Sequence, residues 1–130
     1  MVVDTSALLA LLFHEQEAER VADAIATDAR RLASAFTVLE AGIVVEARKG
    51  EPGGRELDLL LRRIELESVP LTASLVEVAR DAWRRFGRGK HPASLNIGDC
   101  CAYALARVSG EPLLFKGANF SSTDVAVVEY

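Results

Sequence analysis

Three carboxylates of this chain lie among apolar or small residues, whereas most of its other acids share charged stretches. They are Asp4 in VVDTS, Glu40 in TVLEA and Asp99 in NIGDCC. A carboxylate beside a core needs a cation or hydrogen-bond donors to offset its desolvation. If the three converge, their hard oxygen ligands would suit Mg²⁺ or Mn²⁺.

Such a site would support hydrolysis of a phosphodiester. A bound divalent ion polarises a phosphoryl oxygen and lowers the pKa of a bound water, which makes a nucleophile near neutral pH. Asp4, Glu40 and Asp99 are therefore the candidate catalytic and metal-ligating residues, with Glu40 acting directly or through a water. A structural alternative stays open: Glu40 and Asp99 could each be an acid in a first helical turn, worth ~0.3–1 kcal/mol against the helix dipole.

Alternating helical and extended segments should position these acids. Helical spacing predicts helices over Ser6–Phe13, Gln16–Thr27, Thr37–Arg48, Arg55–Glu65 and Ala73–Phe86, and one that Asn96 caps and that runs through Val108. A turn is expected at Glu51–Gly54. Short apolar runs predict strands at Val2–Asp4, Arg31–Ala35, Glu67–Leu71, Pro112–Phe115 and Val125–Val128.

This alternation predicts an α/β fold with a mainly parallel sheet of four to five short strands flanked by helices. In such sheets ligands bind beyond the carboxyl ends of the strands. Asp4 would follow strand one, and the other two acids would lie in first turns of helices. The 130 residues are expected to form a single domain.

Composition restricts the classes of partner. Half of the residues are hydrophobic and the formal net charge is −4, so nucleic acid would have to bind through a local basic patch or metal-bound phosphate. No stretch approaches the ~20 apolar residues of a membrane span, and the start lacks the basic segment of a signal peptide. The adjacent Cys100 and Cys101 fit neither a redox pair nor a zinc site. The expectation is a cytoplasmic protein whose cysteines pack in a helix.

Four segments resemble a known family: MVVDTSALLALL, SAFTVLEAGIVVEAR, GKHPASLNIGDCCAYALA and PLLFKGANFSSTDVAVVEY. Together, in this order, they look like the VapC toxins, the PIN-domain ribonucleases of type II toxin–antitoxin pairs. The resemblance implies a PIN-like three-layer fold over residues 1–130 and a pocket binding Mg²⁺ or Mn²⁺. It further implies metal-dependent endoribonuclease activity, a homodimer and a small VapB-like antitoxin.

Residue by residue, the acids of the family fall on Asp4, Glu40 and Asp99. The fourth acid does not match, because the chain has Asn119 where relatives usually carry Asp before Phe. An amide oxygen can ligate but brings no charge, which puts binding of a second metal in doubt. Asp124 also matches a family position and would support the pocket or cap its loop. Thr5 and Ser6 would cap the first helix or orient Asp4.

A basic run offers contacts for an RNA backbone. The candidates are Arg84, Arg85, Arg88, Lys90 and His91, together with Lys116 at the end of the fourth predicted strand. The alternative for the run is structural, since basic residues favour the last turn of a helix. His91, followed by Pro92 in a loop, is expected to be structural or to face phosphate rather than bind metal. A surface role is the alternative for Lys116.

Other functions fit less well. A haloacid-dehalogenase-like enzyme would need a second Asp two residues after Asp4, where the chain has Ser6. A receiver domain would need an acceptor acid after the third strand, which Val69-Pro70-Leu71 lacks. The alternative outside catalysis is a weakened PIN fold, without its fourth acid, that acts mainly by binding its antitoxin.

Overall fold

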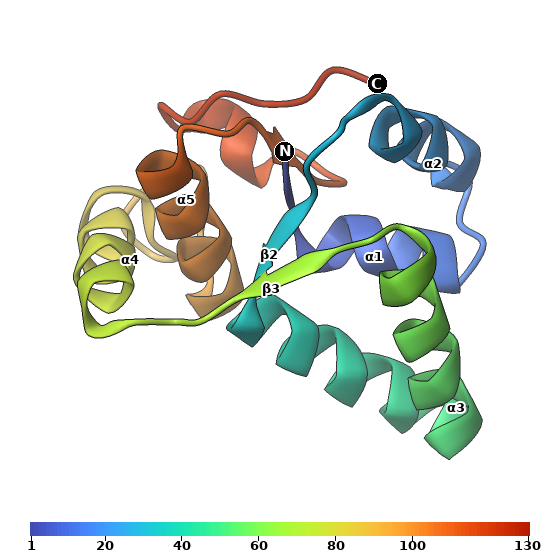
Figure 1. The fold of residues 1–130 in the computed structure, drawn as a ribbon. Coiled ribbons are helices and arrows are strands. Elements are labelled where there is room, and N and C mark those ends of the chain that lie inside the picture. Colours follow the sequence, from blue (N-terminus) through green and yellow to red (C-terminus); the bar gives the residue numbers. More distant parts are fainter.

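A four-stranded sheet forms the centre of the computed structural model, which describes residues 1–130 (Figure 1). Its strands are β1 (Val2–Val3), β2 (Leu32–Ser34), β3 (Glu67–Val69) and β4 (Leu113–Leu114). Their order is β3-β2-β1-β4 and every pairing is parallel. The predicted parallel α/β sheet is confirmed, with four strands. All carboxyl ends therefore lie at one edge of the sheet.

Five helices cover the sheet, and side chains cap most of them. They are α1 (Thr5–Leu12), α2 (Ala18–Thr27), α3 (Ala35–Arg63), α4 (Ala73–Phe86) and α5 (Ile97–Ser109). Asp4 and Ser34 cap α1 and α3, and the predicted caps Thr72 and Asn96 begin α4 and α5. None of these helices is both long and apolar enough to cross a membrane.

The two predicted helices, Thr37–Arg48 and Arg55–Glu65, are the two halves of α3, which meet at a break at Gly50, but the predicted turn at Glu51–Gly54 is wrong. Residues 51–54 are helical, and the break in α3 is confined to Gly50, whose φ of 67° and ψ of −165° suit glycine. Pro52 fits because it lies in the first turn after the break, where a helix needs no backbone donor. The second half of α3 turns back at an angle to the first (Figure 1), and the Leu57 side chain lies next to Gly42.

Alternate strand residues point into two separate apolar cores. Val2 and Leu113 pack with α4, α5 and the C-terminal segment, whereas Val3 and Leu114 pack with α1, α2 and α3. Helices α4 and α5 lie on one side of the sheet and α1 and α3 on the other (Figure 1). The expected three-layer arrangement follows from strands that are apolar on both faces.

The predicted last strand, Val125–Val128, is wrong. This segment makes a single parallel bridge, between Leu113 and Val127, and two backbone hydrogen bonds to Leu113. Because its partner strand β4 is only two residues long, this segment cannot form a longer ladder of hydrogen bonds. The polar loop before it contains a 3₁₀ turn, Asn119–Ser122.

Candidate functional site

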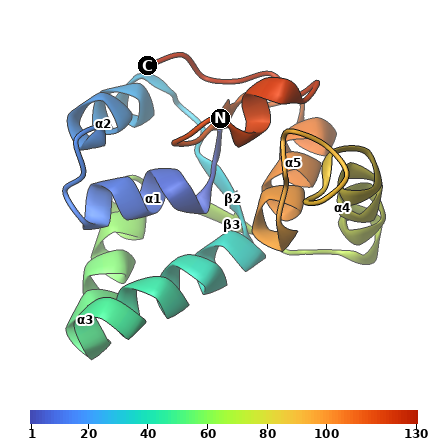
Figure 2. The ribbon, with the colours of Figure 1, turned by 180° about the vertical axis from the view of Figure 1, so that it is seen from behind.

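A cavity of about 280 Å³ lies at the carboxyl edge of the sheet, and it contains all three predicted acids. Figure 2 shows the starts of α1, α3 and α5 close together there. The cavity is lined by Asp4, Thr5, Ser6, Leu9, Glu40, Val44, Asn96, Asp99, Lys116, Asn119 and Phe120. Residues distant in the sequence meet because β1 and β2 end side by side.

Asp4 is buried and caps α1. Its Oδ2 accepts hydrogen bonds from the Ser6 backbone N–H (3.0 Å) and the Ser6 hydroxyl (2.6 Å). That hydroxyl accepts in turn from the Lys116 backbone N–H (2.9 Å). Burial raises the pKa of Asp4 from 3.8 to about 6; the bonds from Ser6 oppose this rise, and the charges of Asp99 and Glu40 add to it. Asp4, rather than Thr5 or Ser6, is therefore the cap, and Ser6 orients it.

Glu40 reaches the cavity from the second turn of α3, not from the first turn as predicted. The difference arises because Ser34 caps α3, three residues before Thr37. The Thr5 hydroxyl donates to Glu40 Oε1 over 2.5 Å. The carboxylate also lies against Gly98 in α5, where a Cβ would be only 2.5 Å from Oε1. A larger residue at this position would displace the Glu40 carboxylate from where it lies now.

Asp99 both caps α5 and lines the cavity, which are the two alternatives that the sequence left open. It forms a capping box with Asn96, whose backbone N–H donates to Asp99 Oδ2 over 3.0 Å. The side chain is buried and still lines the cavity. Asn119 Nδ2 donates to the same Oδ2 over 3.3 Å, so the C-terminal loop does deliver Asn119 to the site.

The charges of the cavity suit a divalent cation. Asp4, Glu40 and Asp99 each turn one oxygen to protein donors, and the other oxygen has no hydrogen-bond partner in the protein. The Lys116 ammonium pairs with Glu15 and Glu17, so it does not neutralise these acids. No three His, Cys, Asp or Glu side chains form a ready-made cluster of ligands. The donor set is nevertheless that of Mg²⁺ or Mn²⁺, which keep waters and need only a few carboxylates.

Asp124 does not line this cavity. Its Oδ1 accepts from the Tyr103 hydroxyl over 2.5 Å, and its Oδ2 accepts from Arg85 Nη2 over 2.9 Å. Tyr103 lies one turn after Asp99 on α5, so Asp124 binds beside the pocket rather than in it.

The candidate RNA contacts form three groups. Arg84 and Arg85 pair with Asp81 on α4. Lys90 lies 4.3 Å from the centroid of the Trp83 ring, and the His91 ring packs edge-on against Phe86 and accepts from the Ala93 N–H. Arg88 has no carboxylate partner and, with Arg84, borders a cavity of about 740 Å³ between α4 and α5.

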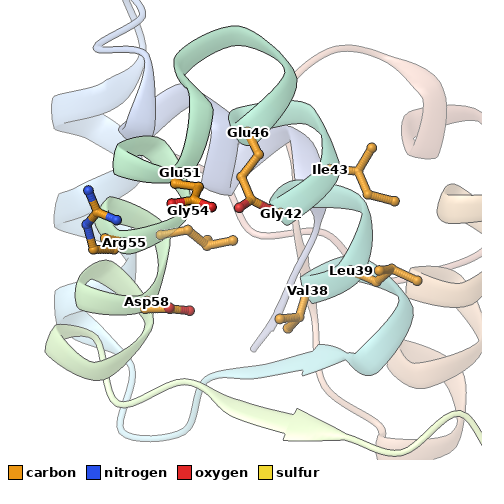
Figure 3. A pocket seen from close by; sticks show the side chains of 10 residues that line it. Val38, Leu39, Gly42, Ile43, Glu46, Glu51, Gly54, Arg55 and Asp58 are labelled. Atoms are coloured by element: carbon orange, nitrogen blue, oxygen red, sulfur yellow. The ribbon is translucent and has the colours of Figure 1, made fainter.

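That apolar cavity shares Asn96 with the acidic one, and Cys100 and Cys101 also line it. Burial raises the pKa of Cys100 to about 11, so its thiol stays protonated. The cysteines therefore pack as apolar residues, as predicted. A further cavity of about 450 Å³ lies between the halves of α3 (Figure 3), and none of the predicted site residues line it.

Sequence reasoning missed two residues near the acids. Gly98 accommodates Glu40, and its signal was a glycine within the first turn of a helix, which costs ~1 kcal/mol relative to alanine and needs a reason. Tyr103 binds Asp124, and its signal was a polar tip four residues after Asp99.

Comparison with known proteins shows the family to which the chain belongs. The family model described as PIN domain matches residues 1–126. The chain is 55% identical over 128 residues to Ribonuclease VapC of Mycolicibacterium smegmatis, covering 98% of this chain and 99% of that one. It is 52% identical to Ribonuclease VapC30 of Mycobacterium tuberculosis, with 98% of both chains covered.

Solved structures share the fold. Mycobacterium tuberculosis VapC20, described as a sarcin-ricin loop cleaving toxin, superposes with a TM-score of 0.80 at 18% identity, covering 98% of this chain and 97% of that one. VapBC2 from Rickettsia felis, bound to a promoter DNA fragment, gives 0.77 at 15% identity, with 98% and 96% covered. The chain belongs to the PIN domain family and, within it, to the VapC ribonucleases.

Proposed function

We propose that this VapC ribonuclease cleaves RNA in the acidic cavity, with Asp4, Glu40 and Asp99 holding Mg²⁺ or Mn²⁺. The observation that carries the proposal is the cavity itself. Three carboxylates from three separate elements line it, each with one oxygen free, and the nearby lysine is already paired with other acids. A cation bound by the three free oxygens would offset the part of their desolvation that the protein donors leave uncompensated.

The protein groups around the acids hold them in place for hydrolysis. Ser6 fixes Asp4, Thr5 fixes Glu40, and Asn96 with Asn119 fixes Asp99. A divalent ion held by these acids supplies Lewis acidity and a water of lowered pKa. Hydrolysis of the phosphodiester by such a water, with departure of the 3′ oxygen, would leave a 5′-phosphate and a 3′-hydroxyl.

The RNA backbone would be held outside the cavity. Arg88 lines the α4–α5 groove that shares Asn96 with the site, Lys90 lies over the Trp83 ring of the same groove, and neither has a carboxylate partner. We propose that they contact phosphates next to the cleaved bond. Because its substrate is RNA, the protein would act in the cytoplasm, as one PIN-like domain.

The protein also exposes apolar surface on α3 to which the partners of a VapC toxin can bind. Leu39, Ile43 and Leu59 on α3 are about 60% exposed, although they are large and apolar. We propose that a VapB-like antitoxin and a second copy of the chain cover such surface, since exposed apolar patches mark interfaces. Light scattering of the chain alone and with its antitoxin measures both associations.

The decisive experiment is RNA cleavage by the purified chain with EDTA, and after adding back Mg²⁺ or Mn²⁺. Cleavage should stop in EDTA, return with either ion and be lost in Asp4→Asn. Asp58→Asn, which changes an exposed acid of the α3 cavity, should cleave like the wild type. Ends bearing a 2′,3′-cyclic phosphate would exclude attack by water.

The second candidate function is that of a weakened fold that acts by binding its antitoxin. Asn119, a neutral residue beside Asp99, is the observation in its favour. Absence of cleavage with either ion, combined with retained antitoxin binding, would establish this function instead.

A further inference from the structure

Three side chains outside the acidic cavity form a continuous polar network. Tyr103 Oη donates to Asp124 Oδ1 over 2.5 Å, and Arg85 Nη2 donates to Asp124 Oδ2 over 2.9 Å. Arg85 Nη1 also reaches Tyr103 Oη, at 3.4 Å. The network joins α4, α5 and the C-terminal segment, which no backbone ladder connects at this point.

The network is built on a rigid base. Tyr103 is only 1% exposed, and its ring packs against Phe86 with a centroid distance of 5.8 Å. The Arg85 guanidinium lies 4.7 Å from the centroid of the same Phe86 ring. The Tyr103 hydroxyl and then Arg85 lower the pKa of Asp124, so this residue is a carboxylate at neutral pH. Tyr103 and Arg85, the two partners of Asp124, are thus both packed against the Phe86 ring.

The segment between Asp124 and the acidic cavity is short and internally bonded. It contains the 3₁₀ turn Asn119–Ser122, and the Thr123 hydroxyl and N–H both donate to the Phe120 carbonyl. Phe120 is 1% exposed and packs on Phe115 at 5.0 Å. A segment closed in this way transmits a displacement of Asp124 to Asn119 instead of absorbing it.

Asn119 is the end of the segment that reaches the acids. Its Nδ2 donates to Asp99 Oδ2, the oxygen that also accepts from the Asn96 N–H. The two donors hold Oδ2, so Asp99 Oδ1 is the oxygen left for another ligand. Asn119 is itself exposed, with no other side-chain bond to keep it there.

We propose that Arg85, Asp124 and Tyr103 position the 117–124 loop so that Asn119 orients the Asp99 carboxylate for metal binding. They act as positioning residues, since none of them lines the acidic cavity. The inference rests on the metal site of the proposed function. It assigns to Asp124 and Arg85 a role distinct from lining the pocket or binding RNA.

The test is the affinity of the full chain for Mn²⁺, measured by calorimetry without RNA. Tyr103→Phe removes one hydroxyl and should weaken binding roughly tenfold, the lower end of what partners that orient metal ligands contribute. Asp124→Asn, which retains the shape of the side chain, should weaken it in the same direction. Tyr130→Phe removes the other tyrosine hydroxyl, which donates to the Phe115 carbonyl, and should bind Mn²⁺ like the wild type.

A double-mutant cycle separates positioning from a general loss of structure. In an Asn119→Ala background, Tyr103→Phe should have no further effect on Mn²⁺ affinity, because its effect passes through Asn119. An equal loss in both backgrounds, or unchanged affinity in Tyr103→Phe and Asp124→Asn, would overturn the inference. If Asp99→Asn also binds Mn²⁺ like the wild type, the metal site of the proposed function fails with it; if Asp99→Asn loses Mn²⁺, only the inference fails.

Discussion

Replacing Asp4 by Asn should make the metal-free protein more stable while it removes activity. The charge of Asp4 is buried against two other carboxylates, and burial is the main reason for its raised pKa. Asn keeps the shape and an oxygen that can accept the Ser6 N–H, and it is itself a good N-cap. The substitution therefore removes the desolvated charge and retains the cap of α1.

The magnitude follows from the pKa of Asp4 and depends on pH. Between 3.8 and about 6 the unfolded chain has lost the proton and the folded chain still binds it, so the free energy of unfolding falls as pH rises. Above that range, ionisation of the buried Asp4 carboxyl lowers the free energy of unfolding by the full ~3 kcal/mol, and at pH 5 by about half of this amount. Asp4→Asn should escape this cost, so its advantage should be small near pH 4 and largest at pH 8.

Urea unfolding in EDTA at pH 4, 5 and 8 measures the difference. At pH 8 the order should reverse with Mn²⁺ in thousandfold excess over Kd, because this stabilises a folded state that binds the ion by ~4.1 kcal/mol, more than the ~3 kcal/mol cost of the buried charge. Asp4→Asn should lose most of that gain. A variant less stable than the wild type in EDTA at pH 8, or a difference independent of pH, would refute the claim that Asp4 is a desolvated carboxylate.

Three other substitutions test separate contacts. In Gly98→Ala the methyl would lie 2.5 Å from Glu40 Oε1, so cleavage should fall at least about tenfold while stability in EDTA changes by less than about 1 kcal/mol; unchanged cleavage would argue against a role for Glu40. The Thr37 hydroxyl is buried without a hydrogen-bond partner, so Thr37→Val should leave stability in urea equal or raise it by about 1 kcal/mol, and a clear loss would reveal a missing partner. Asn119→Asp removes the Nδ2 donor to Asp99 but adds a negative charge beside it, and we expect the charge to have the larger effect, so that Mn²⁺ binding tightens and cleavage at low Mn²⁺ rises; weaker affinity in calorimetry would mean that the lost donor matters more, and unchanged affinity that the ion does not sense residue 119.

Local patterns were enough to predict the architecture. Short apolar strands separated by amphipathic helices led to the parallel sheet, and Thr72 and Asn96 were identified as caps because their type and position relate to neighbouring residues only. The three acids were found by their apolar surroundings. Parallel strands necessarily end at one edge of a sheet, so the convergence of Asp4, Glu40 and Asp99 followed from the predicted topology.

Local sequence patterns gave wrong predictions of secondary structure where the outcome depends on residues distant in the sequence. Pro52 and two glycines predicted a turn, yet Gly50 alone absorbs the break and residues 51–54 stay helical. Val125–Val128 has the composition of a strand but meets a β4 of only two residues, so it forms a single bridge. In both cases the surrounding structure overrides local propensity.

The sequence by itself thus determined the order of the elements, the sheet and the identity of the acids, because these depend on periodicity and residue type. Only the tertiary structure decided how the acids are held. The space that Gly98 leaves for Glu40, the pairing of Lys116 with Glu15, and the contact of Asp124 with Tyr103 all join residues from separate elements. Such contacts depend on distances across the packed molecule, and a one-dimensional pattern of residue types carries no information about those distances.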